Sequence, residues 1–564
     1  MLRRLILLAL TVAFTARTSA QTQTQVSSPI SQPIPGHLLI LYRSHTIPAD
    51  ADSLARAAGA RATHHLRHLG VTALSVAPTD EPRALAKLAA NPQVALVLHD
   101  RYVTGHSIVF NHPHLVVSLD SGGPTTSGSS TSTTITRHSV ARTPLKPRTD
   151  PNPPSSSGGN ESTSTSTSSN NPPPSLTDLY YNSPQGWAVR TAGGYGDGVP
   201  GGAVAGPWNT TLGAGVRIAI LDSGVDANHP DISPNLALNL SEVNQDAHTG
   251  LPSPCDDGSP QDQSGHGTWT ASLAAGALGP GTGNVIGVAP QATILNIKVL
   301  QRMAASGITD PTAACEAGEP GGLLSWVLQG IDDAVANHAD IIALSLGTLV
   351  DTSTGEGAGL KSAFDQAAYA ATQAGTVVIA ALGNDGLDLS TGTLVELPAE
   401  ARGVLAITAS TNPDCAENLT AGATCSTGPV TRPYYSNYDS ALNAIAAPGG
   451  SYPEGSTTAT NPAFSLGNSG WVMGACSSGL TNTTDGLPAN GQSLGCFNLG
   501  HTAYVQAMGT SASAALAAGA AAILRAARPD LTAPQILDAL RFSATSTPSM
   551  KEPQLNLAAA LALP

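Results

Sequence analysis

Four short polar motifs in this sequence either follow an apolar, strand-like run or open a run of small residues. Asp222-Ser223-Gly224 comes directly after Val216–Leu221, and Asn384 follows Thr376–Ala381. His266 and Ser511 each open a small-residue, helix-like run, in Ser264-Gly265-His266-Gly267-Thr268 and Gly509-Thr510-Ser511-Ala512-Ser513. Each motif alone is common as a turn or a helix N-cap. Together, an aspartate, a histidine and a serine are the residue types of nucleophilic catalysis, in which an imidazole activates a hydroxyl.

The elements around these motifs predict an α/β fold. From about residue 179 onward, continuous apolar runs alternate with Ala-rich helical stretches. Such alternation indicates a parallel sheet covered by helices on both faces, with the ligand site beyond the carboxyl ends of the strands. The expected strands are 216–221, 292–299, 340–346, 376–381 and 404–409, and the expected helices include 323–336 and 360–374.

The order and wording of the motifs resemble the subtilisin-like (subtilase) serine proteases. That family has Asp, His, Asn and Ser in the motifs D-[ST]-G, H-G-T, G-N and G-T-S, in this order. The sequence also contains the family landmarks Gly287-Val288-Ala289-Pro290, Ser345-Leu346-Gly347 and Ala447-Pro448-Gly449. The resemblance covers about residues 214–560 and implies a subtilisin-like fold.

The resemblance implies a role for each motif residue. Ser511 would be the nucleophile, His266 the general base and Asp222 the group that orients and stabilises the imidazolium. Asn384 would donate its side-chain amide to the oxyanion beside the Ser511 N–H. Ser345, Leu346 and Gly347 would line one edge of the substrate groove, and Gly321 and Gly322 the opposite edge. The substrate would then be an extended polypeptide held by strand addition.

The sequence departs from the family pattern near two of these motifs. Trp269 stands where the family usually has a second histidine, and Ser272 stands where it usually has a glycine. Ala515 stands where the family usually has a proline after the nucleophile. None of these changes touches a triad atom, so we expect repacking that alters rate or specificity.

The N-terminal part predicts export and a zymogen. Residues 1–20 have the layout of a secretory signal peptide. Residues 33–105 predict a small α+β unit with strands at 37–42, 72–76 and 94–98 and helices at 49–58 and 81–90, and it resembles the family's inhibitor-type propeptide. Residues 119–178 form a Ser/Thr/Pro-rich tract that is expected to be a disordered linker. Residues 179–564 would be the catalytic domain.

Composition and charge exclude other classes. The 564-residue chain has a net charge of −14, which argues against a nucleic-acid binder. Residues 1–177 carry a net charge of +6 and the rest −20, which favours either attraction between the two parts or, equally, a surface that is acidic only for solubility. Beyond the N-terminus no apolar run reaches the ~18 residues of a membrane helix. We expect a monomer with no transmembrane segment.

Six cysteines favour disulfides in an exported chain, although six allow fifteen connectivities. Two pairs would close short loops rich in Gly, Ser, Thr and Asn, and the remaining two cysteines would pair by elimination. Metal binding is the alternative, but no Cys-x-x-Cys spacing occurs. The expected pairs are Cys415–Cys425, Cys476–Cys496 and Cys255–Cys315.

The sequence thus predicts a secreted, self-processing serine endopeptidase that needs no cofactor for its chemistry. The alternative is a non-catalytic subtilase-fold binding protein of the cell envelope. Structural calcium is left undecided, because Asp231 matches a position that often binds it in the family, whereas the loop Gly279–Val285 lacks the usual Asn pattern.

Overall fold

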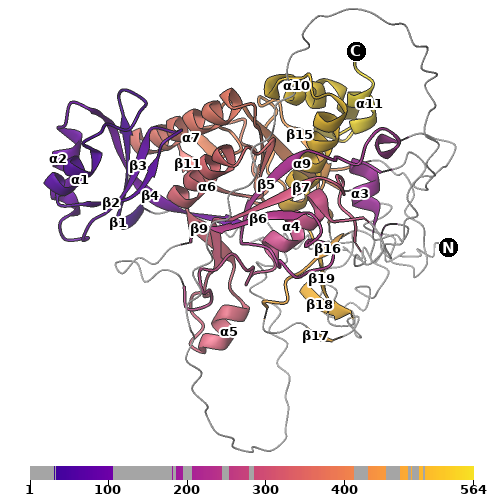
Figure 1. Cartoon of the computed structure of the whole chain (residues 1–564), viewed down its shortest axis with the longest axis horizontal. Coiled ribbons are helices and arrows are strands. Elements are labelled where there is room, and N and C mark those ends of the chain that lie inside the picture. Colours follow the sequence, from indigo (N-terminus) through magenta and orange to yellow (C-terminus); the bar gives the residue numbers. More distant parts are fainter. Residues whose placement is uncertain are drawn as a thin grey trace, which may run out of the picture.

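The computed structural model describes most of the two parts that the sequence predicts to be folded. The described residues are 31, 33–105, 181, 186–194, 206–243, 253–278, 285–411, 430–451, 471–480, 484–485, 495–499 and 502–564. The predicted signal peptide, the predicted linker and the predicted pair Cys415–Cys425 lie outside these residues. Figure 1 shows a smaller N-terminal unit beside a larger body.

The N-terminal unit is an antiparallel sheet with two helices. In chain order its elements are β1 (Pro33–Tyr42), α1 (Ala51–Ala58), β2 (Arg61–Leu66), β3 (Val71–Ser75), α2 (Glu81–Ala89) and β4 (Val94–Gly105). The sheet order is β4-β1-β3-β2, and one side of it buries a small apolar core against α1 and α2. The structure therefore contains the expected α+β arrangement, with one strand, β2, that the sequence analysis did not predict.

The body is built on a nine-stranded sheet in which eight strands run parallel. Its order is β20-β21-β15-β14-β12-β10-β5-β7-β6, and only the edge strand β20 is antiparallel to its neighbour. The strands are β5 (Arg217–Asp222), β6 (Leu236–Ser241), β7 (Thr293–Lys298), β10 (Ile341–Leu344), β12 (Val377–Ala381), β14 (Val404–Ser410), β15 (Ile445–Pro448), β20 (Thr545–Thr547) and β21 (Met550–Gln554).

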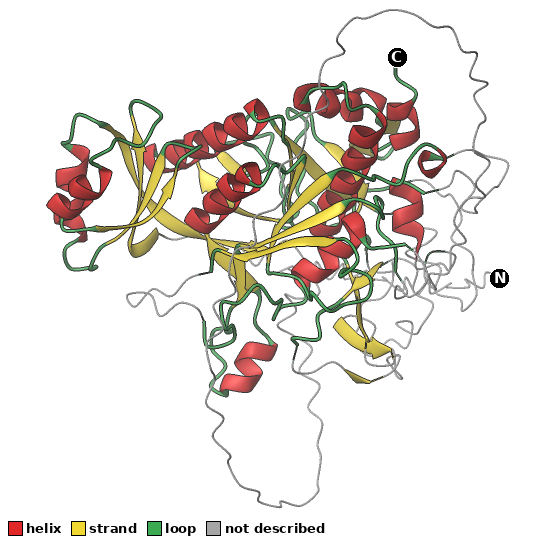
Figure 2. Cartoon of the chain, viewed as in Figure 1, coloured by secondary structure: helices red, strands yellow, loops and turns green. Residues whose placement is uncertain are grey.

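Helices cover both faces of this sheet, as Figure 2 shows. Along β5, Ile218 and Ile220 belong to one core and Ala219 and Leu221 to the other, because successive side chains of a strand point to opposite faces. Helices α4 and α9 pack on the first face, and α6 and α7 pack on the second. The described helical segments of the body are α3 (Trp187–Ala192), η2 (Pro207–Asn209), α4 (His266–Ala275), α5 (Pro311–Glu316), α6 (Leu324–Ala336), α7 (Gly355–Gln373), α9 (Thr510–Ala527), α10 (Ala533–Ser543) and α11 (Leu557–Leu561). The expected fold class, a parallel sheet between helices preceded by a small α+β unit, is confirmed.

A second sheet joins the N-terminal unit to the body. Strand β4 continues past the N-terminal unit and pairs with two strands of the body, β9 and β11. The strands that complete this sheet are β8 (Leu300–Arg302), β9 (Pro320–Leu323), β11 (Leu346–Asp351) and β13 (Leu394–Leu397). The sequence pattern predicts that β4 ends at residue 98. The strand extends to Gly105, because the body supplies partners for the remaining backbone groups.

A third, smaller sheet lies against α4, with the order β16-β19-β18-β17. Its strands are β16 (Val472–Ala475), β17 (Thr484–Asp485), β18 (Gly495–Leu499) and β19 (Thr502–Ala507). Disulfides join Cys476 to Cys496 beside this sheet and Cys255 to Cys315 elsewhere in the body. Two of the three expected pairs are thus present.

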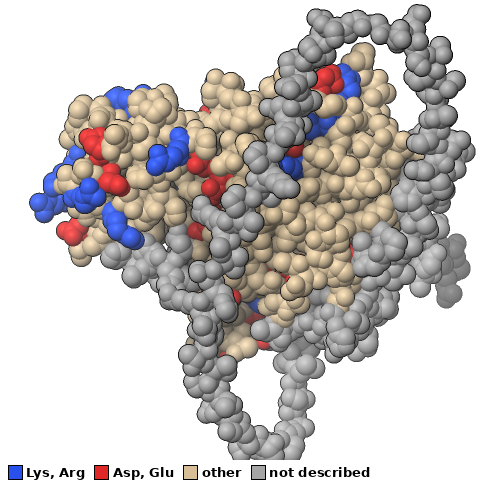
Figure 3. Space-filling view, in the orientation of Figure 1, with Lys and Arg blue, Asp and Glu red and all other residues tan. Residues whose placement is uncertain are grey.

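Charged contacts hold the N-terminal unit on the body. Arg101 and His99 on β4 both contact Glu356 in the first turn of α7, at 2.8 Å and 2.7 Å. His68 contacts Asp332 on α6 at 2.9 Å. Figure 3 shows other Lys and Arg side chains on the outer surface of the N-terminal unit, away from the body. Among the described residues these side-chain contacts add to the pairing of β4 with β9 and β11 and to a shared apolar core.

Among the described residues, one helix, α9, has the length and composition of a membrane span. In the structure 83% of that helix is buried inside the protein. Because it contacts five strands of the main sheet, α9 serves as the central core helix of the body.

Candidate active site

The carboxyl ends of neighbouring parallel strands bring the polar motifs to one edge of the main sheet. β10 lies between β5 and β12, in register with both. Asp222 is the last residue of β5, Ser345 directly follows β10, and Asn384 lies three residues beyond β12. Parallel strands end at the same edge, so the order of the strands places these three residues close to one another.

Asp222, His266 and Ser511 form a continuous chain of polar contacts. His266 Nδ1 lies 2.6 Å from Asp222 Oδ1, and His266 Nε2 lies 3.0 Å from Ser511 Oγ. All three residues are fully buried. His266 is the first residue of α4 and Ser511 the second of α9, so two packed helix starts aim the two side chains at each other.

Further hydrogen bonds fix the Asp222 carboxylate. Its Oδ2 accepts from Thr270 Oγ1 at 2.9 Å, and its Oδ1 also accepts from the Ser223 backbone N–H at 2.7 Å. Thr270 is on α4, the helix that begins with His266, so the carboxylate is tied to the histidine's own helix as well as to its ring. The arrangement orients the imidazole with Nδ1 toward Asp222 and Nε2 toward Ser511.

Asn384 lies at the start of α9 beside the serine. Its side-chain Oδ1 accepts from the Thr510 backbone N–H at 3.0 Å and from Thr510 Oγ1 at 2.9 Å. These bonds engage Oδ1 as an acceptor, so the side-chain donor of Asn384 is its Nδ2 amide. Thr510 was not identified from the sequence, because a threonine before a serine is a common helix start.

The predicted groove residues hold a strand, and that strand is the chain's own β4. Gly105 and Thr104 pair with Leu346 and Gly347 on β11. On the other edge, Thr104 and Val103 pair with Gly321 and Gly322 on β9. Ser345 makes a different contact: its Oγ donates to the Ser511 carbonyl oxygen at 2.9 Å, and its own carbonyl oxygen lies 3.0 Å from Ser511 Oγ.

The end of β4 covers the imidazole. A Cβ atom added at Gly105 would lie 3.1 Å from His266 Cε1 and 3.2 Å from Nε2. It would also lie 2.8 Å from Pro320 Cγ, so only glycine fits easily between the two side chains. The burial of His266 is therefore caused in part by the chain's own N-terminal unit.

Asp262, four residues before His266, is a buried carboxylate that sequence analysis missed. Its Oδ1 accepts from Ser223 Oγ at 2.9 Å and from the backbone N–H groups of Ser264 and Gly265 at 2.9 Å and 2.8 Å. Its Oδ2 accepts from the N–H and Oγ1 of Thr268. Burial raises the pKa of Asp262, while the hydrogen bonds from Thr268 and Gly265 and the charge of Lys298 act in the opposite direction.

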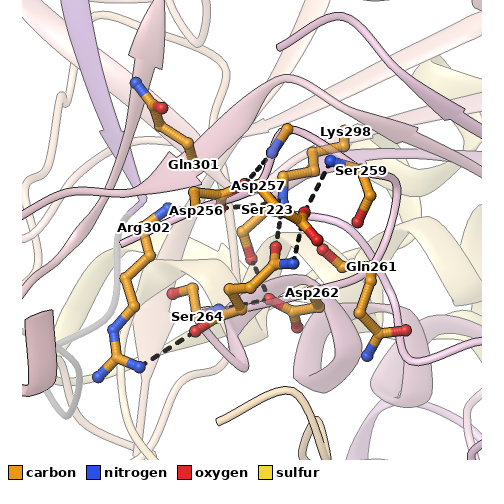
Figure 4. A network of polar contacts seen from close by, with 12 residues as sticks. Ser223, Asp256, Asp257, Ser259, Gln261, Asp262, Ser264, Lys298, Gln301 and Arg302 are labelled. Carbon is orange, nitrogen blue, oxygen red and sulfur yellow. Dashed lines mark hydrogen bonds and ion pairs between the residues drawn. The ribbon is translucent and has the colours of Figure 1, made fainter. Parts of the chain in front are cut away.

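The loop that leads to His266 is anchored on β7 by a buried lysine (Figure 4). Lys298 Nζ contacts both carboxylate oxygens of Asp256 at 2.9 Å. It also donates to the Gln261 carbonyl oxygen at 2.8 Å and to Gln263 Oε1 at 2.6 Å. A lysine at the end of a parallel strand carries no recognisable sequence signal, so this anchor too is visible only in the structure.

The departures from the family pattern on α4 have partners in the small sheet. Trp269 Nε1 donates to the Val472 carbonyl oxygen at 3.2 Å. Ser272 Oγ accepts from the Ala475 N–H at 2.9 Å. Both residues therefore link α4 to the neighbouring strand β16 by hydrogen bonds.

Within the described part of the chain, no group of three or more His, Cys, Asp and Glu residues is placed to hold a metal ion. Asp231 is fully buried, and its Oδ2 lies 3.8 Å from His229 Nδ1. Residues 279–284 of the loop considered for calcium lie outside the described residues. Structural calcium therefore stays a prediction from the sequence alone.

Comparisons with known proteins agree with this arrangement. The model of the subtilase family matches residues 213–558. The chain is 36% identical over 195 residues to subtilisin E of Bacillus subtilis (strain 168). This alignment covers 35% of this chain and 41% of that protein. The chain is also 35% identical over 179 residues to thermitase of Thermoactinomyces vulgaris. This second alignment covers 32% of this chain and 51% of that protein. The matched regions thus span about half or less of these relatives.

Two solved structures share the fold at low sequence identity. Fervidolysin from Fervidobacterium pennivorans, a keratinolytic enzyme related to subtilisin, aligns with a TM-score of 0.55 at 18% identity and covers 94% of this chain and 61% of its own. The epidermin leader peptide processing serine protease of Staphylococcus aureus aligns with a TM-score of 0.57 at 15% identity, over 93% of this chain and 98% of its own. Since the family model covers more than half of the sequence, the chain belongs to the subtilase family.

Proposed function

We propose that this protein is a serine endopeptidase that hydrolyses peptide bonds through Asp222, His266 and Ser511. The observation that carries the proposal is the unbroken contact chain from Asp222 Oδ1 through both ring nitrogens of His266 to Ser511 Oγ, at 2.6 Å and 3.0 Å. Membership of the subtilase family supports the same assignment.

The reaction follows from the positions of these atoms. Ser511 Oγ attacks the carbonyl carbon of the substrate while His266 Nε2 takes its proton, and Asp222 stabilises the imidazolium that forms. The oxygen of the tetrahedral intermediate accepts hydrogen bonds from the Ser511 N–H and from Asn384 Nδ2. Collapse expels the amine, which receives the proton from His266 and leaves an ester on Ser511. Water, activated by the same imidazole, then releases the acid and restores the serine.

The substrate is proposed to be an extended polypeptide. Strands β9 and β11 offer backbone groups on both sides of the groove, and β4 already pairs with both. A peptide substrate would replace β4 as the central strand, gaining backbone hydrogen bonds that depend little on its sequence.

The N-terminal unit is proposed to act as an intramolecular inhibitor of a secreted zymogen. Its last strand fills the groove, and Gly105 lies against His266. Self-cleavage would fall at one of the first peptide bonds beyond Gly105, in residues outside the described part of the chain. The signal-like N-terminus and the family membership support export.

The non-catalytic alternative uses the same groove only for binding, and it is less favoured because all four motif positions are filled. A fluorophosphonate probe separates the two functions, since it reacts with a serine that a histidine activates. The wild type should be labelled and Ser511→Ala should not. Asn384→Ala should lower kcat on a peptide substrate by about 10²–10³ with a smaller change in KM. Absence of labelling in a folded, processed wild type would favour the alternative, and labelling of Ser511→Ala would refute the assignment of the nucleophile.

A further inference from the structure

A segment of the small sheet runs along the helix that begins with His266. Near the C-terminal end of α4, Ser272 accepts a hydrogen bond from Ala475. From Ala475 the segment continues past the N-terminal end of α4, where Cys476, Ser477 and Ser478 meet the loop that precedes His266. Cys476 lies against Gly265, and Ser477 bonds to Gln261 and Asp262, so these contacts fall within five residues of the histidine. Ser478 bonds to the Asp226 carboxylate, in the turn after β5.

The Cys476–Cys496 disulfide lies directly against Gly265. A Cβ atom added at Gly265 would lie 2.7 Å from Cys476 Sγ and 3.2 Å from Cys496 Sγ. Gly265 has a φ of +87°, which favours glycine, and it is the residue bonded to His266. The two sulfurs thus close off the space into which the backbone beside the histidine could move.

The disulfide also fixes where the segment lies. Cys476 directly follows β16, and Cys496 is on β18. Both strands pair with β19, which lies between them. The bond therefore links the two strands on either side of β19 and closes the chain between Cys476 and Cys496, a separation of 20 residues.

Of the two serines next to the disulfide, Ser477 holds this loop by hydrogen bonds and Ser478 holds the turn after β5. Ser477 is fully buried; its Oγ donates to the Asp262 carbonyl oxygen at 2.5 Å and accepts from Gln261 Nε2 at 3.0 Å. Ser478 donates through its N–H and its Oγ to Asp226 Oδ2, at 2.9 Å and 2.6 Å. On the other side of the same loop, Lys298 binds the Gln261 carbonyl oxygen at 2.8 Å. The loop is thus held between β7 and the disulfide-closed segment.

We propose that the segment Cys476–Ser478, closed by its disulfide, is a positioning element for His266, an inference that rests on the proposed function. Proton transfer from Ser511 depends on the 3.0 Å contact to His266 Nε2, and an error of about 1 Å in such a contact can cost about 10²-fold in rate. The segment touches neither the groove strands β9 and β11 nor the serine in any described contact. Its loss should therefore act on the chemical step and leave substrate binding nearly intact.

The test compares a deletion of this disulfide with a control variant, both in the full chain. Cys476→Ala with Cys496→Ala should lower kcat by ~10-fold or more while KM changes less than about twofold. Because the imidazolium is then held less well by Asp222, the acid limb of the pH–rate profile should move to lower pH.

The control is Thr376→Ala, which removes a buried hydroxyl that donates to the Ala339 carbonyl oxygen at 2.7 Å, at the end of β12 opposite to Asn384. It should lower the unfolding temperature, because that oxygen loses its donor, yet it should keep its kcat and its acid limb. If both variants lower kcat equally, or if the Cys476/Cys496 deletion leaves kcat and the acid limb unchanged, the positioning role is refuted. An inactive wild type would instead refute the proposed function itself.

A second variant covers the case in which the cysteine deletion fails to fold. Ser477→Ala keeps the disulfide and removes only the hydroxyl that contacts Asp262 and Gln261. It should lower kcat several-fold with KM unchanged and should shift the acid limb in the same direction. A Ser477→Ala enzyme with wild-type kcat and acid limb would contradict the proposal.

Discussion

The Asp262 carboxylate links the turn after Asp222 to the first turn of the helix that begins with His266. It receives hydrogen bonds from Ser223 on one side and from Ser264, Gly265 and Thr268 on the other. Since all these donors need an acceptor, the site depends on a residue that takes no part in the chemistry.

Asp262→Asn is expected to lower kcat by about 10-fold to 100-fold and to change KM little. The amide replaces one acceptor oxygen by a donor, so at least one buried N–H or O–H loses its partner, at a cost of about 1–3 kcal/mol in stability. Steady-state kinetics and thermal unfolding of the variant check both effects. Asp538→Asn, the same change at an exposed position on α10, is the control and should resemble the wild type. Equal kinetics for the two variants would show that Asp262 does not position the histidine.

Glu400 provides a pH-dependent contribution to stability that is separate from the active site. Burial raises the pKa of this carboxyl from 4.5 to about 8. A raised pKa in the folded state favours folding below the unfolded pKa, and this contribution is lost as the pH rises from about 4.5 to 8. Glu400→Gln should therefore stabilise the protein at about pH 9 and have little effect at about pH 5. The gain in free energy of unfolding at pH 9 should be on the order of 1–2 kcal/mol, because the carboxyl group is partly exposed to solvent.

Thermal unfolding of this variant in a Ser511→Ala background, which avoids self-digestion, makes the comparison. Equal stabilities of the two proteins at both pH values would mean that Glu400 is already ionised in the folded state.

Among the residues of the site, those within recognisable motifs could be predicted and those held only by tertiary contacts could not. Asp222, His266, Asn384 and Ser511 each sit in a short motif at the end of a strand or the start of a helix. Asp262 and Lys298 act from positions that have no motif of their own, one in a loop and one at the end of β7. Their partners are backbone groups and amide side chains that become neighbours only after folding.

At the scale of elements, β4 is the strand that connects the N-terminal unit to the active site. The sequence predicted only its first residues, because their apolar pattern matches the core of the N-terminal unit. The rest of the strand, up to Gly105, is formed by pairing with β9 and β11. The strand β2 was missed for a related reason: its sequence Arg61–Leu66 is mostly polar and forms an edge strand whose partner, β3, is set by the fold.

Docking of the N-terminal unit should weaken as the pH rises above neutrality. The hydrogen bond to Glu356, followed by that to Glu81, raises the pKa of His99 above its ordinary 6.5. In turn the bond from His99, with help from Arg101, lowers the pKa of Glu356 to about 2. The stabilisation from the His99 charge is complete below about pH 6.5 and is lost as the pH rises through the raised pKa.

After processing, the fraction of the N-terminal fragment that stays with the body in gel filtration should therefore be larger at about pH 6 than at about pH 9. Glu356→Gln should reduce docking at pH 6 and flatten the difference. If the retained fraction is independent of pH in the wild type, the His99–Glu356 contact does not control docking.

At the scale of the whole molecule, three parts of the fold meet at the active site. The main sheet brings Asp222, Ser345 and Asn384 to one edge, the helices α4 and α9 add His266 and Ser511, and the N-terminal unit occupies the groove with β4. The composition could predict the charge difference between the two parts, but not that the docking contacts involve His99, Arg101 and His68 while other basic side chains face outward.

Self-cleavage by Ser511 is tested most directly by the intact mass of the purified protein. The wild type and Ser511→Ala are expressed in parallel in a host deficient in proteases. The wild type should lose its N-terminal region at one of the first bonds beyond Gly105, whereas Ser511→Ala should keep that region. If both proteins are processed alike, or if both keep the N-terminal region under conditions in which the wild type is folded, self-cleavage by Ser511 is contradicted.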